Sequence, residues 1–194
     1  MYSKLFTALG CCLVVIGLIG IAKASMQPIK AIIGQHYLEV AWKESLKANK
    51  LSKPWRSADF YMIGELTVPK LKISRVILNS ASGEAMAWGI GRVDNINKTR
   101  TKQPIILAGH RDSHMQFMYD LKVGDKIELM MSDLSVQTYM ITKTGITNKP
   151  ALDIPENLNK KNSLILTTCW PKKALKDSGQ RYIIFANNQI ASNV

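Results

Sequence analysis

Residues 164–169 read Leu-Ile-Leu-Thr-Thr-Cys, and this stretch is the strongest single indication of the fold. A short apolar run that continues into two threonines is typical of a strand buried inside a sheet. Similar short runs recur at residues 66–68, 104–108, 126–131 and 182–186. Short strands with short connections predict an all-β barrel or sandwich, not a regular alternation of helices and strands.

The remaining segments complete this pattern. Alternation of apolar and polar residues begins at Met62 and is interrupted by Pro69, which predicts two strands or one bent edge strand. Residues 136–144 are rich in threonine and predict a further strand. Short helices are expected at 82–87 and 113–121. About seven or eight strands result, which is enough to close a barrel.

The N-terminus carries a different signal. Residues Leu5 to Ala22 hold no charge, and as a helix they would span about 27 Å, close to the thickness of a hydrocarbon core. Residues 1–24 are therefore predicted to be an uncleaved membrane anchor or a cleaved signal segment, and both alternatives remain open. In either case we expect the rest of the chain to be delivered across the membrane.

Residues 25–53 are predicted to form a helical stalk, or a helix packed on the folded domain. Apolar side chains recur there at helical spacing, at Ile29, Ile32, Ile33, Tyr37 and Val40. The helix is expected to end near Asn49, and the sequence Lys53-Pro54-Trp55 then forms a break because proline disfavours continuation of a helix. The folded domain is then expected to span residues 54–194.

Charge and cysteine content restrict the function. The net charge of +12 favours an anionic neighbour such as a membrane surface or a cell-wall polymer. No zinc-finger spacing or RNA-binding motif is present, and no nucleic-acid partner is expected behind an export segment. Cys11 and Cys12 lie in the apolar run, which leaves Cys169 for the folded domain. We expect neither a disulfide scaffold nor a metal site or cofactor.

Three residues at predicted strand ends suit cysteine-based acyl transfer. His110 follows the strand at 104–108, Cys169 ends the strand at 164–169, and Arg181 precedes the last strand. A thiolate can attack a carbonyl, a histidine can move the proton, and an arginine can stabilise the oxyanion. The residue types alone do not decide the matter, because a lone cysteine after an apolar run is more often a core residue.

The local sequence around these residues is more specific. Leu107-Ala108-Gly109-His110-Arg111, then Leu166-Thr167-Thr168-Cys169, then Arg181 before an apolar strand, together resemble the sortase family. The segment Gly64–Leu71 is similar to the first barrel strand of sortases. One departure is Ile165, which stands where the family usually has threonine. This departure affects strand packing and subclass more than the nucleophile.

This resemblance implies a closed eight-stranded sortase-type β-barrel with short helices. It implies that Cys169 is the nucleophile, His110 the general acid and base, and Arg181 the residue that binds substrate and stabilises the oxyanion. Thr168 and Trp170, the neighbours of the cysteine, are candidate substrate-binding residues, although core or rim packing explains them equally well.

The resemblance also implies the partners and the location. The expected substrate is a protein with a C-terminal LPxTG-like sorting signal, and the acceptor is an amine. Ala81-Ser82-Gly83 and Trp88-Gly89 make the chain most similar to the sortase class associated with Gram-negative bacteria. We therefore expect a single-pass protein of the inner (cytoplasmic) membrane, with its catalytic domain on the periplasmic or extracytoplasmic side.

Two other functions fit parts of the sequence. A membrane-anchored cysteine peptidase would use the same three residues but release the acyl group to water. A non-catalytic, membrane-anchored binding barrel would carry Cys169 as a buried and inert thiol. The Thr-Cys sequence and the following arginine favour an enzyme over a binding barrel.

Overall fold

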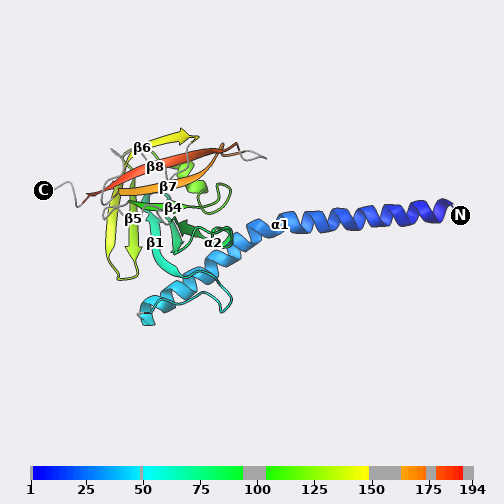
Figure 1. Ribbon diagram of the computed structural model, residues 1–194, viewed down its shortest axis with the longest axis horizontal. Coiled ribbons are helices and arrows are strands. Elements are labelled where there is room, and N and C mark those ends of the chain that lie inside the picture. Colours follow the sequence, from blue (N-terminus) through cyan, green and yellow to red (C-terminus); the bar gives the residue numbers. More distant parts are fainter. Residues whose placement is uncertain (1, 49, 94–103, 149–162, 174–177, 190–194) are drawn as a thin grey trace.

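The computed structural model describes residues 2–48, 50–93, 104–148, 163–173 and 178–189. Within this part of the chain, eight strands form a closed barrel in the order β1-β2-β3-β4-β7-β8-β6-β5 (Figure 1). The all-β barrel predicted from the short apolar runs is therefore confirmed. Closure leaves no unpaired sheet edge, which explains why such short strands can form a stable sheet.

Seven of the eight strands lie close to the predicted runs, and β3 has no counterpart among those runs. Their bounds are β1 Met62–Val68, β2 Ile73–Leu78, β3 Ile90–Arg92, β4 Ile105–Ala108, β5 Lys126–Met131, β6 Val136–Thr147, β7 Ser163–Trp170 and β8 Gln180–Asn188. The 3₁₀ helix η1 (Pro69–Leu71) separates β1 from β2, so the interruption at Pro69 does divide two strands. The predicted loops at 94–103 and 148–161 lie outside the described residues except for Asn148.

Two short helices connect the strands. Helix α2 spans Gly83–Trp88 and begins at Ser82, whose hydroxyl accepts a hydrogen bond from the backbone N–H of Ala85. Such a cap satisfies a donor that the first helical turn leaves unpaired. The second element, the 3₁₀ helix η2, spans Gln116–Asp120. The predicted segment 113–121 contains η2, and the predicted segment 82–87 covers α2 except for its last residue, Trp88.

Helix α1 is continuous from Tyr2 to Ala48, so the predicted anchor and stalk segments belong to one helix. Its C-terminal half lies against the barrel (Figure 1). Leu38 and Trp42 are buried there in a cluster with Phe60, Met62 and other residues of the adjoining loop and strands. This cluster fixes the direction of the helix relative to the barrel.

The packed face of α1 is not the one indicated by the apolar spacing. Ile33, Tyr37 and Val40 are exposed, whereas Gly34 and the side chains of Leu38, Trp42 and Ser45 are buried. The reason is the close approach at Gly34, where a Cβ atom would lie 2.3 Å from the ring of Trp88. A glycine lets the helix touch α2, and this contact decides which face turns inward.

The N-terminal half of α1 projects away from the barrel (Figure 1). Described side chains in this half are apolar and exposed, and Phe6 and Ile16 are 71% and 65% exposed. Among the residues described, no helix combines the length and the apolar character needed to cross a membrane. The transmembrane helix expected over residues 5–22 is therefore not confirmed by the structure.

Candidate active site

Cys169 is the penultimate residue of β7 and is partly exposed. Strand β7 lies between β4 and β8, and its first six residues are buried. Its alternating side chains point to two sides, because Leu164 and Leu166 join the barrel core while Ile165 belongs to a separate outer cluster. By the same alternation, Cys169 lies on the outer face together with Ile165.

Arg181 lies directly opposite Cys169. Strands β7 and β8 are antiparallel, and the register pairs Cys169 with Arg181. Directly opposite residues in an antiparallel pair have Cα atoms about 5 Å apart and side chains on the same face. The guanidinium of Arg181 donates a hydrogen bond of 3.0 Å to the backbone carbonyl of Gln180. This bond holds the guanidinium near the start of β8.

His110 lies at the same end of the barrel on the other side of Cys169. Strands β4 and β7 are parallel, and the register pairs Ala108 with Thr167. Strand β4 ends at Ala108, and His110 follows two positions later, while Cys169 follows Thr167 by the same two positions within β7. The hydroxyl of Thr168 donates a hydrogen bond of 2.8 Å to the carbonyl of Gly109. This bond connects β7 to the segment that follows β4, just before His110.

The outer face beneath these residues is apolar. Ile106, Ile165 and Ile183, on β4, β7 and β8, are buried there. Between this cluster and Cys169 lies Thr167, which is 6% exposed. Its hydroxyl is buried and has no hydrogen-bond partner among the described residues. An unpaired buried hydroxyl costs about 1–3 kcal/mol, so a polar partner at this position would be stabilising.

The two predicted substrate-binding residues have structural partners. Thr168 is 3% exposed, and its hydroxyl is already bonded to Gly109. Trp170 is partly exposed and packs against Tyr119 and Tyr182, with ring centroids 5.9 Å apart in each pair. These contacts account for both residues as parts of the fold, and their contact with a substrate stays a prediction.

His114 is the second histidine near the site, and its surroundings differ from those of His110. It is 3% exposed, whereas His110 is exposed. Burial lowers the pKa of His114 to about 4, and its Nε2 lies 3.4 Å from the carbonyl of Ala87. His114 is therefore neutral at neutral pH and lacks the acidic imidazolium proton that a general acid would give to a leaving amine.

Sequence reasoning did not identify Tyr119. It lies within the predicted short helix, and its hydroxyl donates a hydrogen bond of 2.6 Å to the carbonyl of Cys169. The two residues are 50 positions apart, so periodicity along the chain could not indicate the contact. The apolar residues Phe117 and Leu121 of the same segment pack in the barrel core.

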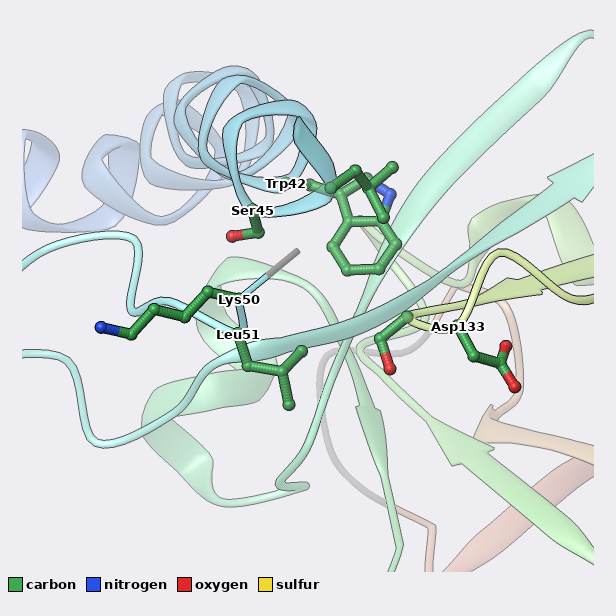
Figure 2. Close-up of a pocket in the computed structure, with 7 residues that line it drawn as sticks. Trp42, Ser45, Lys50, Leu51 and Asp133 are labelled. Carbon is green, nitrogen blue, oxygen red and sulfur yellow. The ribbon is translucent and has the colours of Figure 1, made fainter. Parts of the chain in front are cut away.

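A cavity of about 240 Å³ lies elsewhere, between the end of α1 and the turn from β5 to β6. Figure 2 shows its lining, which includes Trp42, Ser45, Lys50, Leu51 and Asp133. The lining contains no cysteine or histidine, and Arg181 is also absent from it. In the part of the chain that the structure describes, no three His, Cys, Asp or Glu side chains gather as metal ligands would.

Comparison with known proteins identifies the relatives of this chain. A family model described as a sortase domain matches residues 66–189. Sortase D of Bacillus subtilis (strain 168) is 31% identical over 122 residues. This match covers 63% of the present chain and 61% of the relative, so it spans less than two thirds of the relative's length.

Solved structures share the fold at lower identity. Sortase A from Corynebacterium diphtheriae superposes with a TM-score of 0.56 at 14% identity, covering 87% of this chain and 91% of that one. The Clostridium perfringens sortase D5 transpeptidase gives a TM-score of 0.54 at 18% identity, covering 82% and 98% of the two chains. These similarities confirm the barrel fold.

Proposed function

The chain belongs to the sortase family, and from this premise we propose that it is a transpeptidase. Its substrate is a protein with a C-terminal LPxTG-like sorting signal. The enzyme cleaves this signal after its threonine, holds the acyl group as a thioester on Cys169, and transfers it to an amine acceptor. The observation that supports this proposal best is the strand register. It pairs Cys169 with Arg181 and sets β7 beside β4, whose last residue precedes His110 by two positions.

In the first half of the reaction, the sulfur of Cys169 attacks the threonine carbonyl as a thiolate. The carbonyl becomes a tetrahedral oxyanion. Collapse of this intermediate breaks the peptide bond, and the imidazolium of His110 gives its proton to the leaving glycine amine. The products are a thioester on Cys169, a neutral His110 and a released C-terminal peptide.

The second half reverses these roles with a new amine. Neutral His110 takes a proton from the incoming amine, whose nitrogen attacks the thioester carbonyl. The carbon–sulfur bond then breaks, and a new amide bond joins the substrate protein to the acceptor. Cys169 leaves as a thiolate and His110 keeps the proton, which restores the starting state.

Arg181 supplies positive charge throughout. A guanidinium is charged at every physiological pH and can donate two hydrogen bonds from one plane. Because Arg181 is opposite Cys169 in the register, it is placed to bind the oxyanion or a neighbouring substrate carbonyl. Charge stabilisation of this kind contributes about 3–4 kcal/mol to lowering an acyl-transfer barrier.

The apolar outer cluster favours one surface for the substrate. Ile106, Ile165 and Ile183 lie on the face that carries Cys169, and the unpaired hydroxyl of Thr167 separates them from it. An extended peptide bound over this face would lie above these buried side chains and would reach Cys169, which is partly exposed. Thr168 and Trp170 remain proposed contacts at the rim.

The subclass is a finer proposal. The sequences Ala81-Ser82-Gly83 and Trp88-Gly89 favour the class associated with Gram-negative bacteria. The curated relative is a Bacillus sortase D, so the comparisons support the family and give no support to this class.

Membrane attachment is also a proposal. Residues 1–24 would anchor the chain in the cytoplasmic membrane, residues 25–53 would form the stalk, and residues 54–194 would carry the reaction on the extracytoplasmic side. Exposed apolar side chains from Phe6 to Ile21 support this division, because they are unfavourable in water. The full chain should remain with alkali-washed membranes, and a chain lacking residues 1–24 should not. Equal release of both would contradict the anchor.

Transfer and hydrolysis are distinguished by the products. We expect purified enzyme with an LPxTG-containing peptide and millimolar triglycine to yield the peptide joined to triglycine, identified by mass. Without triglycine, the same enzyme should give only slow hydrolysis, because water is a poorer nucleophile than an amine for a thioester.

An unchanged product in the presence of triglycine would contradict transpeptidation. If cleavage continued at the same rate and produced only the free acid, the cysteine peptidase alternative would account for the enzyme. The two chemistries share Cys169 and His110, so only the acceptor separates them.

A further inference from the structure

Three consecutive carbonyls at the end of β7 each accept a hydrogen bond from a side chain. The carbonyl of Cys169 accepts from Tyr119 at 2.6 Å, and the carbonyl of Pro171 accepts from Arg111 at 3.2 Å. Between them, the carbonyl of Trp170 accepts from the hydroxyl of Ser178. The backbone that follows the proposed nucleophile is therefore held by side chains from two other segments.

Tyr119 is the one of these donors that contacts Cys169 itself. It extends from η2, and its ring packs against Trp170 and Tyr182, with centroids 5.9 Å and 5.3 Å away. The ammonium of Lys172 lies 5.3 Å from the centre of the same ring. Packing against these neighbours restricts the ring, so the hydroxyl has a defined direction toward the carbonyl of Cys169.

The hydroxyl of Tyr119 stays protonated at neutral pH. Burial is the largest cause that raises its pKa above the ordinary value, and the nearby Cys169 adds to this effect. A protonated phenol is a hydrogen-bond donor, and a carbonyl is an acceptor. The contact therefore persists over the pH range in which a thiol-dependent enzyme works.

The position of Cys169 in the strand makes this contact consequential. Cys169 is followed by only one more residue of β7, and strand β4 has already ended at Ala108. A hydrogen bond to the carbonyl of a residue limits rotation of its own backbone, which sets the direction of its side chain. In acyl transfer, a displacement of about 1 Å can lower the rate about 100-fold.

We infer that Tyr119 is a positioning residue for the thiol of Cys169, acting through the hydrogen bond to the Cys169 carbonyl. This inference rests on the proposed function, in which Cys169 is the nucleophile. Tyr119 does not touch the reacting atoms, so its effect should appear in the rate of acylation and not in the binding of substrate.

The substitution Tyr119→Phe tests the inference because it removes the hydroxyl and keeps the ring. We expect kcat for peptide cleavage to fall about 10-fold, with KM within about twofold of the parent value. The rate at which iodoacetamide alkylates Cys169, followed by peptide mapping, should also fall about threefold or more, because the displaced thiol lies less favourably beside Arg181.

Tyr139→Phe is the matched control. Its hydroxyl also donates a hydrogen bond of 2.6 Å, to the side chain of Gln137, and Tyr139 pairs with Asn188 at the end of β8 remote from Arg181. Each substitution removes one hydrogen bond, so the two variants should show similar, small decreases in the midpoint of urea unfolding. Only Tyr119→Phe should change kcat and the alkylation rate.

The outcomes separate this inference from the proposed function. Equal kcat and alkylation rates in Tyr119→Phe and the parent enzyme, or equal losses in the two variants, would overturn the role of Tyr119. A parent enzyme without cleavage activity would refute the proposed function. In that case, a slower alkylation confined to Tyr119→Phe would still support positioning of the thiol, and an unchanged alkylation rate would overturn it.

Discussion

Replacing Cys169 by alanine is expected to reduce cleavage and transfer to the level of the uncatalysed reaction, a loss on the order of 10⁴-fold or more. The reason is chemical, because alanine cannot form a thioester and no other cysteine lies in the barrel. Steady-state cleavage of a fluorescent sorting-signal peptide measures this loss directly.

The same variant should remain folded. Cys169 is partly exposed at the end of β7, so removal of its sulfur should change the free energy of unfolding by about 1 kcal/mol or less. A double variant, Cys11→Ala with Cys12→Ala, is the matched control because both thiols are exposed on α1. It should keep full activity. Residual cleavage by Cys169→Ala at the parent rate would contradict the assignment of the nucleophile.

The two histidines four positions apart should give opposite results. His110→Gln should lower kcat by about 10²–10⁴-fold, the usual contribution of a general acid and base. His114→Gln should keep kcat within a few fold of the parent value, because buried His114 is neutral and is bonded to Ala87. A larger loss of kcat in His114→Gln than in His110→Gln would reverse the assignment.

The stability of the folded chain at low pH provides a second test of the buried, neutral state of His114. Burial holds the pKa of His114 at about 4 in the folded chain, below its ordinary value of 6.5. The hydrogen bond to Ala87 opposes this shift, and the charge of Arg75 adds to it. Between these two values the unfolded chain binds more protons than the folded chain, so stability falls as the pH is lowered through this window.

The size of this loss is about 3 kcal/mol between pH 6.5 and 4. Urea unfolding at several pH values measures it. His114→Gln should show a flatter profile in that window. A parent slope that survives in His114→Gln would show that another group carries the acid sensitivity.

The sequence predicted the barrel because its signals are local. The run Leu164–Leu166 predicts a buried strand, and the interruption at Pro69 predicts a break between strands. Each prediction depends only on neighbouring residues, and the structure confirms both. Strand β3 was missed because it has only three residues and contains Gly91. Its place is set by neighbours, since β2 and β4 pair with it on either side.

The buried face of α1 could not be predicted for a related reason. Ile33, Tyr37 and Val40 form the more apolar stripe, yet they are exposed. The contact between Gly34 and Trp88 selects the opposite side of the helix. A glycine carries no hydrophobic signal, so its effect on packing appears only when both partners are in place.

The candidate site also has a part that the sequence predicts and a part that it does not. His110, Cys169 and Arg181 were found because each one borders a strand whose end could be predicted. The strand register then pairs Cys169 with Arg181 and sets the end of β4, which precedes His110, beside β7. The contact between Tyr119 and the carbonyl of Cys169 and the unpaired hydroxyl of Thr167 depend on tertiary packing, and no spacing along the chain indicates them.

The central claim is that Cys169 carries a covalent acyl group during the reaction. The most direct measurement is the intact mass of the enzyme after rapid acid quenching with an LPxTG-containing peptide, followed by peptide mapping. We predict one adduct equal to the acyl fragment that ends at threonine, located on Cys169 and released by neutral hydroxylamine as a thioester should be. Cleavage of the peptide with no adduct, or with an adduct on any other residue, would contradict the account.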